Sequence, residues 1–390
     1  MTGKSPSKTV KSRGNVRRRT GSGRGRVRRV LVTGYPGFLG KRLVAQLLAS
    51  EPQSHFYLLV QEKFLEDARK YVKALRRRNL ERVKLLSGDI ADMHLGLAAS
   101  EVKEITARVT DIYHLAAISY LRVPEAVIWR VNVEGTGNVL DLAGECRRLQ
   151  RFNHMSSCYV SGSRKGVVME EELDEGQSFR NPYERTKFEA EKLVRRAASH
   201  LPVSIYRPAI VVGDSRTGEI GRFDGPYYLG MLLASSPVAV PLPLPGRGEA
   251  PVNMVPVDYV TTAVCALSRE RQAEGMTFHL VDPNPLSARR VYHLLAQRTG
   301  RKTSRLRVSV GLAKAILKIP GLEKVSRAHR QAMDYLDTMT FYNHQNSDRL
   351  LLPRGITCPS FDSYLDRLIE YVKATVAARR RREDDSDPLA

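Results

Sequence analysis

The chain has 390 residues, a length that suits a large α/β domain with a smaller lobe. Apolar residues make up 42% and charged residues 27%, which is typical of a folded soluble protein and excludes a chain that is disordered throughout. No window holds the roughly 18 uninterrupted apolar residues of a membrane-spanning helix. The basic, polar N-terminus lacks the apolar segment of a secretory signal, so we expect a cytoplasmic protein.

Half of the net charge of +22 lies at the N-terminus, because residues 1–29 hold 11 Lys/Arg and no Asp/Glu. A segment rich in Gly, Ser and Arg cannot bury enough apolar surface to fold, so we expect a disordered tail. Binding of this tail to nucleic acid or to an anionic membrane surface is the alternative. Nucleic acid is the less favoured partner, because the tail has no interleaved aromatic residues for base stacking.

The cysteines give no sign of a metal site. The four positions form no CxxC pair and have no histidine cluster nearby: Cys146, Cys158, Cys265 and Cys358. This spacing argues against a zinc site or a disulfide framework and predicts buried free thiols.

From residue 28 onward, short apolar strands alternate with helical stretches. Strands are predicted at 28–34, 55–61, 84–90, 111–117, 152–157 and 203–213. Helices are predicted at 38–50, at 124–149 and from 181 onward. Nearly unbroken apolar strands between helices indicate a parallel sheet that is covered on both faces. The fold class is therefore doubly wound α/β, with ligands at the carboxyl ends of the strands.

This alternation ends past residue 220. The proline-broken segment 237–251 predicts an extended loop, and 276–283 predicts one more strand before a helix capped by Ser287. Residues 308–325 are apolar with sparse lysines and are expected in the core, with an acyl-binding or membrane-facing surface as the alternative. The predicted division is a disordered tail (1–29), a first domain (30–220), a smaller lobe with returns to the first domain (221–375) and a disordered tail (376–390).

A glycine-rich segment joins the first predicted strand to the first helix. Gly34, Gly37 and Gly40 allow a tight turn, a close approach of the backbone to a pyrophosphate, and packing of the helix on the strand. The free N–H groups and the dipole at the start of the helix favour that anion. The other residues expected to contact a dinucleotide lie in this turn or at the ends of later strands: Thr33, Phe38, Leu39, Asp89, Ile90, Leu115, Ala116 and Ala117.

The end of the second strand bears on the choice between NAD and NADP. An acidic residue there favours NAD, and an arginine favours the 2′-phosphate of NADP. The chain has Gln61, which is neutral, followed by Glu62, which can bind a ribose hydroxyl, and Lys63, which can bind a phosphate. We expect NADPH, with NADH as the alternative.

Tyr183 and Lys187 lie four residues apart on a helix that Asn181 can cap, so they share one face. Hydride transfer to a carbonyl needs a proton donor, and free tyrosine, with a pKa of about 10, is a slow acid at neutral pH. A lysine ammonium one turn away favours the phenolate, lowers that pKa, and can hold the ribose of the cofactor. Ser157, at the end of the fifth strand, can donate a hydrogen bond to the substrate oxygen. Each pattern alone also fits ordinary packing, but their joint occurrence after the glycine turn favours an oxidoreductase.

Residues 28–370 resemble the extended short-chain dehydrogenase/reductases. The resemblance implies that 30–220 is a Rossmann domain that binds NAD(P) and that 221–375 is mainly a substrate-binding lobe. It assigns catalysis to Ser157, which stands five residues before Gly162 in SSCYVSG, and to Tyr183, Lys187 and, in VNVEGT, Asn132 as the support of a proton relay. It assigns cofactor binding to the glycine turn, Tyr183, Lys187, Arg207 and Pro208.

Within that family the chain is most similar to the fatty acyl-CoA reductase and thioester reductase branch, which includes the male-sterility-type proteins. Three segments carry this similarity: GYPGFLG, GQSFRNPYERTKFEAEKLV (176–194) and RPAIVVGDSRTGE (207–219). The branch implies reduction of an acyl thioester, on coenzyme A or on a carrier protein, to an aldehyde by NADPH. Gln61 departs from the arginine that the branch commonly has after the second strand.

Two other functions remain open at this point. One is a hydroxysteroid- or sugar-nucleotide-type dehydrogenase or epimerase on the same fold. The other is a non-catalytic dinucleotide-binding scaffold with a tail that binds nucleic acid, against which the intact Ser, Tyr and Lys set argues. A peripheral contact with a membrane and a homodimer are also left open.

Overall fold

The computed structural model describes residues 27–119, 123–221, 248–300 and 338–384. Residues 1–26 of the predicted basic tail, residues 237–247 of the predicted loop and the apolar stretch 308–325 lie outside the described residues. Among the residues that the structure does describe, no helix is long and apolar enough to cross a bilayer.

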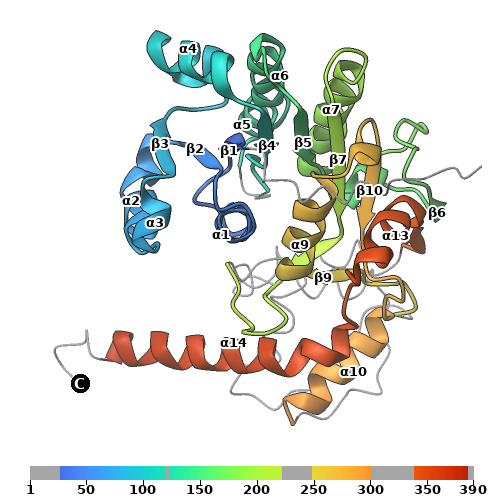
Figure 1. The fold of residues 1–390 in the computed structure, drawn as a ribbon. Helices are drawn as coiled ribbons and strands as arrows, with labels where there is room; N and C mark the ends of the chain where they lie inside the picture. The colour runs from blue at the N-terminus through green and yellow to red at the C-terminus, as the bar shows by residue number, and fades with distance from the viewer. Residues whose placement is uncertain (1–26, 120–122, 222–247, 301–337, 385–390) are drawn as a thin grey trace, which may run out of the picture.

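A seven-stranded parallel sheet forms the centre of the molecule (Figure 1), in the order β10-β7-β5-β4-β1-β2-β3. Its strands are β1 (Arg29–Thr33), β2 (His55–Val60), β3 (Val83–Ser87), β4 (Asp111–His114), β5 (Arg151–Met155), β7 (Val203–Pro208) and β10 (Thr277–Leu280). The chain runs outward from β1 to β3 and then returns to β4 on the other side of β1. This reversal is the switch point at which doubly wound sheets bind dinucleotides, and it confirms the predicted fold class.

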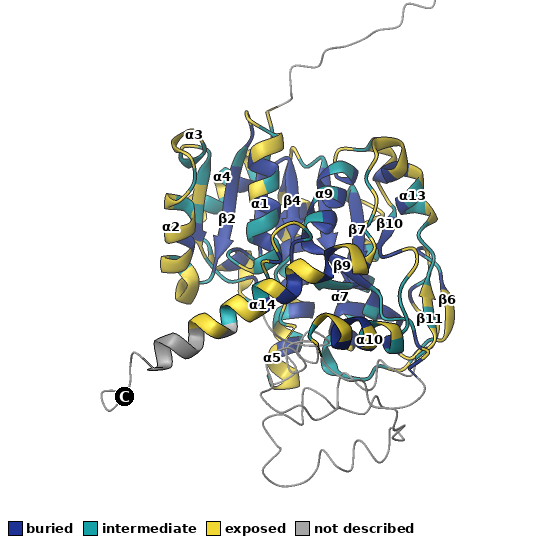
Figure 2. Ribbon diagram, turned by 90° about the horizontal axis from the view of Figure 1, so that it is seen from below, coloured by how far each residue is buried: buried dark blue, intermediate teal, exposed yellow. Residues whose placement is uncertain are grey.

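Helices cover both faces of the sheet, as Figure 2 shows by the dark strands between lighter helices. The covering helices are α1 (Phe38–Ser50), α2 (Leu65–Lys73), α3 (Arg77–Leu80), α4 (Ala99–Arg108), α5 (Glu125–Trp129), α6 (Gly135–Glu145), α7 (Pro182–Ala197) and α9 (Val257–Leu267). Successive strand residues point to opposite faces, so Val30 and Val32 join the core under α1 and α9, and Leu31 joins the core under α6 and α7. The residues on both faces of these strands are therefore largely buried, including polar ones such as Asn153 and His154 in β5.

Two predicted elements are divided in the structure. The helix predicted over 124–149 contains a π-helical turn, η3 (Arg130–Glu134), between α5 and α6, and it ends at Glu145. The strand predicted over 203–213 is β7 followed by β8 (Ile210–Val212), which leaves the large sheet and pairs with β9 (Met254–Pro256). The pattern of apolar residues does not predict either division, because both depend on elements distant in sequence: η3 packs on α7, and β8 pairs with β9.

The smaller lobe surrounds the carboxyl edge of the sheet. It includes β8, β9, α10 (Ala288–Arg298) and α14 (Phe361–Asp384), which share a core. A parallel pair, β6 (Gly166–Val168) and β11 (Thr340–Tyr342), and α13 (Gln345–Leu351) lie beside β10. The expectation of disorder from residue 376 is wrong as far as Asp384, because α14 continues to that residue. Alanine and arginine are good helix formers, and they extend a helix whose first half is anchored in the core.

Candidate active site

The glycine turn leads from β1 into α1 at the switch point of the sheet. Gly34 has φ +83°, and a Cβ atom on it would lie 2.7 Å from the backbone nitrogen of Ala116. A Cβ on Gly37 or on Gly40 would lie 2.7 or 2.6 Å from the carbonyl oxygen of Gly34. The turn therefore requires glycine at all three positions, because β-carbons would force it open.

The start of α1 fits an anionic group. Gly37 is the N-cap of α1 and has no side chain that could accept a hydrogen bond from the first amides. The first helical hydrogen bond is donated by the Lys41 amide to the Gly37 carbonyl, at 2.8 Å. The amides of Phe38 and Leu39 precede it, at the end of the helix where N–H groups have no helical acceptor. A cofactor pyrophosphate placed here would be held by these amides and by the helix dipole.

Thr33, the last residue of β1, supports this turn. The residue is fully buried, and its hydroxyl lies 2.8 Å from Nδ1 of His114 and accepts the amides of Leu115 and Ala116 at 3.2 Å. The Thr33 hydroxyl thus bonds to the end of β4, and the predicted contact of this residue with the cofactor stays a prediction. Leu115 and Ala116 are half-buried and Ala117 is exposed, so these positions stay accessible beside the turn.

A relay of hydrogen bonds runs from the turn to the π-helical segment. The Thr136 hydroxyl donates to the Asn132 carbonyl at 2.6 Å, so Nε2–H of His114 donates to Thr136 (3.0 Å) and Nδ1 accepts from Thr33. Burial keeps this ring neutral by lowering the pKa of His114 to about 3, with Lys187 adding to the fall. Sequence reasoning included neither His114 nor Thr136 among the site residues.

The side chains of Gln61 and Asp89 meet where β2 and β3 end, the place at which the sequence predicts the adenosine part of the cofactor. Gln61 Nε2 donates to Asp89 Oδ2 at 2.6 Å. Lys63 is exposed and lies 5.0 Å from the ring centre of Phe64. Ile90, in contrast, is buried, and its side chain faces Gly135 at the start of α6. Its side chain therefore belongs to the core, and its predicted contact with the cofactor stays a prediction.

Ser157 and Tyr183 are brought together by the end of β5 and the start of α7. Asn181 caps α7 by accepting the Glu184 amide at 3.0 Å, which confirms the predicted cap and fixes the first turn that carries Tyr183. Ser157 is buried, accepts the amide of Tyr159 at 3.2 Å, and is hydrogen-bonded to the Tyr183 hydroxyl. Since the amide uses a lone pair, the serine proton is free for the tyrosine or for a substrate oxygen.

Burial, and not Lys187, has the largest effect on the pKa of Tyr183. Burial raises the pKa of Tyr183, Ser157 opposes the rise, and Glu184 adds to it. The predicted lowering by Lys187 is not found, because the lysine Nζ donates to the Met155 carbonyl at 2.7 Å. Tyr183 is consequently a phenol at neutral pH, the form that can give a proton.

Lys187 is buried beneath the site on the next turn of α7. Burial lowers the pKa of Lys187 to about 8, and the negative charge of Glu191 opposes that fall. The side chain is mostly an ammonium at neutral pH. Asn132, also buried, donates to Ile118 O and Thr186 Oγ1 and accepts the Ile118 amide. It thereby joins the π-helical turn to α7 and to the segment after β4.

Comparisons with known proteins agree with this geometry. The family model NAD_binding_4, Male sterility protein, matches residues 32–264. This chain belongs to that family, within the extended short-chain dehydrogenase/reductases. Glycine betaine reductase ATRR of Emericella nidulans is 31% identical over 67% of this chain, and fatty acyl-CoA reductase wat of Drosophila melanogaster is 27% identical over 61%. The chain spans 22% of the first relative and 53% of the second.

A solved structure extends the similarity beyond the sheet. The terminal R domain from the myxalamid PKS-NRPS biosynthetic pathway superposes with a TM-score of 0.75 and 26% identity, over 90% of this chain and 91% of that one. The two chains therefore share nearly their whole fold, including the smaller lobe.

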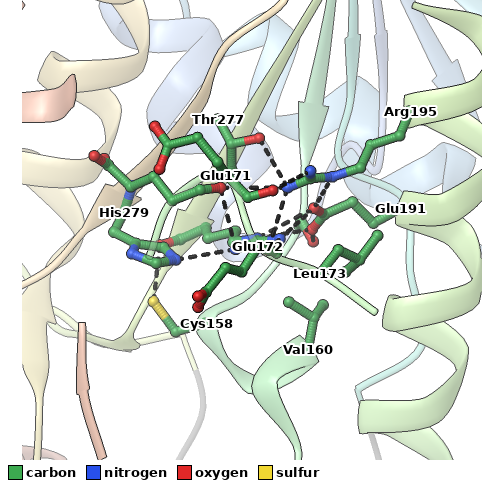
Figure 3. Close-up of polar contacts among 12 residues, drawn as sticks. Cys158, Val160, Glu171, Glu172, Leu173, Glu191, Arg195, Thr277 and His279 are labelled. Carbon is green, nitrogen blue, oxygen red and sulfur yellow. Dashed lines mark hydrogen bonds and ion pairs between the residues drawn. The ribbon is translucent and has the colours of Figure 1, made fainter. Parts of the chain in front are cut away.

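In this reductase-family chain, the side chain of Arg207 is bound within the core. The residue is fully buried and donates to Glu191 (2.6 Å), to Glu172 O (2.7 Å) and to Nε2 of His279 (3.1 Å). Figure 3 shows Glu191 and Arg195 on one side of this network and His279 on the other. The predicted binding of the cofactor by Arg207 and Pro208 stays a prediction, and Pro208 is buried beside Arg207 at the end of β7.

The cysteines are free, as expected from their spacing. Cys146, Cys158 and Cys265 are buried, whereas Cys358 is half-buried. Burial raises the pKa of each thiol, Cys146 and Cys265 to about 12, so they are protonated and unreactive at neutral pH. None of the described contacts places a cysteine in the chemistry of the site.

Proposed function

We propose that this protein reduces an acyl thioester to an aldehyde with NADPH. The observation that carries the proposal is the convergence of Ser157, Tyr183 and Lys187 beside the glycine turn. The names of the relatives support the substrate class, since one is a fatty acyl-CoA reductase and the superposed structure is a terminal reductase domain. When bound, NADPH supplies the hydride.

The residues of the chain would divide the remaining tasks. The Ser157 hydroxyl donates to the thioester oxygen and holds it next to the phenol. The Tyr183 phenol gives its proton to that oxygen as negative charge develops there, a contribution of about 10²–10⁴-fold in rate. The Lys187 ammonium binds the ribose hydroxyls of the cofactor through its N–H donors.

The preference for NADPH rests on the end of β2. Gln61 is neutral and is held by Asp89, so no carboxylate at that position repels a 2′-phosphate. Exposed Lys63 follows it and offers a cation without an ion-pair partner among the described residues.

The test is consumption of NADPH, with NADH alongside, against acyl-CoA thioesters of increasing chain length and against the same acyl groups on a carrier protein. The proposal predicts consumption that depends on the thioester and is faster with NADPH. The Tyr183→Phe variant should lose at least about 100-fold in kcat and bind NADPH normally. Tyr371→Phe, in α14 outside the site, is the matched control. Full activity of Tyr183→Phe would refute the mechanism, and NADPH binding without turnover of any thioester would refute the substrate class.

A further inference from the structure

Glu191 is a fully buried carboxylate in the middle of α7. It accepts hydrogen bonds from the Ser156 hydroxyl (2.6 Å), from Arg207 (2.6 and 3.0 Å) and from Arg195 (3.0 Å). These donors come from the loop after β5, from β7 and from α7 itself. The labelled part of this arrangement, Glu191 with Arg195, is visible in Figure 3.

The position of Glu191 connects it to two residues of the active site, Ser157 and Lys187. Its first partner, Ser156, is the residue immediately before Ser157, so the short bond to Glu191 fixes the backbone from which Ser157 extends. Lys187 precedes it by four residues on the same helix, so the two side chains lie on one face of α7. An ordinary core ion pair would need neither of these relations.

Glu191 also carries the negative charge that raises the pKa of Lys187, against the effect of burial. The titratable groups that face the Lys187 ammonium are Tyr183 and Glu191 on α7, His114 on β4 and His154 on β5. Burial lowers the pKa of both histidines, and the ring nitrogens of His154 have no partner among the described residues, so neither ring carries charge at neutral pH. Tyr183 is a neutral phenol, which leaves the carboxylate of Glu191 to favour the ammonium.

We propose that Glu191 is a positioning residue of this active site: it orients Ser157 through Ser156 and keeps Lys187 in the charged form that binds the cofactor. The inference rests on the proposed function, because it assumes that Ser157 and Lys187 serve that reaction. Glu191 itself touches neither substrate nor cofactor, since its hydrogen bonds to Ser156, Arg195 and Arg207 enclose it in the core.

The test is the pH dependence of NADPH affinity, measured by fluorescence titration of the full chain without substrate. The affinity of the wild type should fall as the pH passes about 8, where Lys187 loses its proton. Glu191→Gln should move this fall to lower pH. A one-unit decrease in the pKa of Lys187 would weaken binding about fivefold at pH 8 and hardly change it at pH 6. Glu189→Gln, on the same helix but half-buried, is the control and should keep the wild-type midpoint.

A second variant separates the two roles. Ser156→Ala should reduce kcat severalfold without moving the midpoint, because it removes the link to Ser157 and leaves the charge of Glu191. If Glu191→Gln does not fold, Glu191→Gln/Arg207→Gln removes both charges of the pair, and its midpoint must still move to lower pH.

The outcomes distinguish this inference from the proposed function. An unchanged midpoint in Glu191→Gln, or in the double variant, overturns the positioning role even if the variant is less stable or slower. A wild type that binds no NADPH at any pH overturns the proposed function and the inference together. A shifted midpoint in a variant with normal affinity at pH 6 supports the inference whatever the substrate proves to be.

Discussion

Replacement of Arg207 by methionine should destabilise the fold strongly, because it isolates a buried charge. The guanidinium is fully buried and makes three hydrogen bonds to the Glu191 carboxylate in addition to those with Glu172 O and His279. Breaking a buried pair by removing one partner costs about 3–5 kcal/mol, which corresponds to a decrease in Tm of roughly 4–6 °C for a chain of this length. Arg185→Met, on the surface of α7 beside Glu125, is the control and should cost at most about 1 kcal/mol.

Two further measurements identify the isolated charge as the cause. Arg207→Met/Glu191→Leu should be more stable than Arg207→Met alone, because an apolar pair of similar volume replaces a buried ion pair at little cost. The hydrogen bonds to Ser156 and Arg195 are lost as well, so recovery should stop about 1–2 kcal/mol short of the wild type.

The pH dependence has a definite sign. In the wild type the pKa of Glu191 is lowered to about 2 from its usual 4.5, chiefly by Arg207 against the opposing effect of burial. Its contribution to stability is therefore complete above pH 4.5 and is lost as the pH falls toward 2. The deficit of Arg207→Met relative to the wild type should be largest near pH 7 and should narrow toward pH 3. Urea unfolding at several pH values measures it, and a deficit that is independent of pH, or equal in the double variant, would refute this reasoning.

Two other changes test the supports of the site. Gly34→Ala should weaken NADPH binding by roughly tenfold or more, because φ is +83° and the new Cβ would lie 2.7 Å from the Ala116 nitrogen. The control Gly137→Ala places its Cβ in open space on α6 and should bind NADPH normally. Equal losses of affinity in a fluorescence titration of the two variants would contradict this expectation. Asn181→Ala and Ser287→Ala each remove an N-cap and should each lower the free energy of unfolding in urea by about 1 kcal/mol. Only Asn181→Ala should also slow turnover, because the Asn181 cap orients the catalytic tyrosine. Indistinguishable activities of the two variants would argue against this role.

The sequence by itself determined the local features of this protein. The glycine turn, the cap at Asn181 and the spacing of Tyr183 and Lys187 depend on residues that are close in the chain, so their patterns were readable without a structure. The doubly wound order followed from apolar strands between helices, since strands buried on both faces need no polar alternation. The similarity in GQSFRNPYERTKFEAEKLV narrowed the function to a branch of one family.

Only the tertiary structure decided which partner each polar side chain has. The sequence assigned Arg207 and Thr33 to cofactor binding but named no protein partner for them. Packing of β7 against α7 places the Arg207 guanidinium on Glu191, and the Thr33 hydroxyl contacts His114. Glu191 carried one weak local signal, its place one turn after Lys187, which does not distinguish a solvated glutamate from a buried one. The energetic reason is general: a buried polar group must find a partner wherever the fold provides one, and that partner is usually distant in sequence.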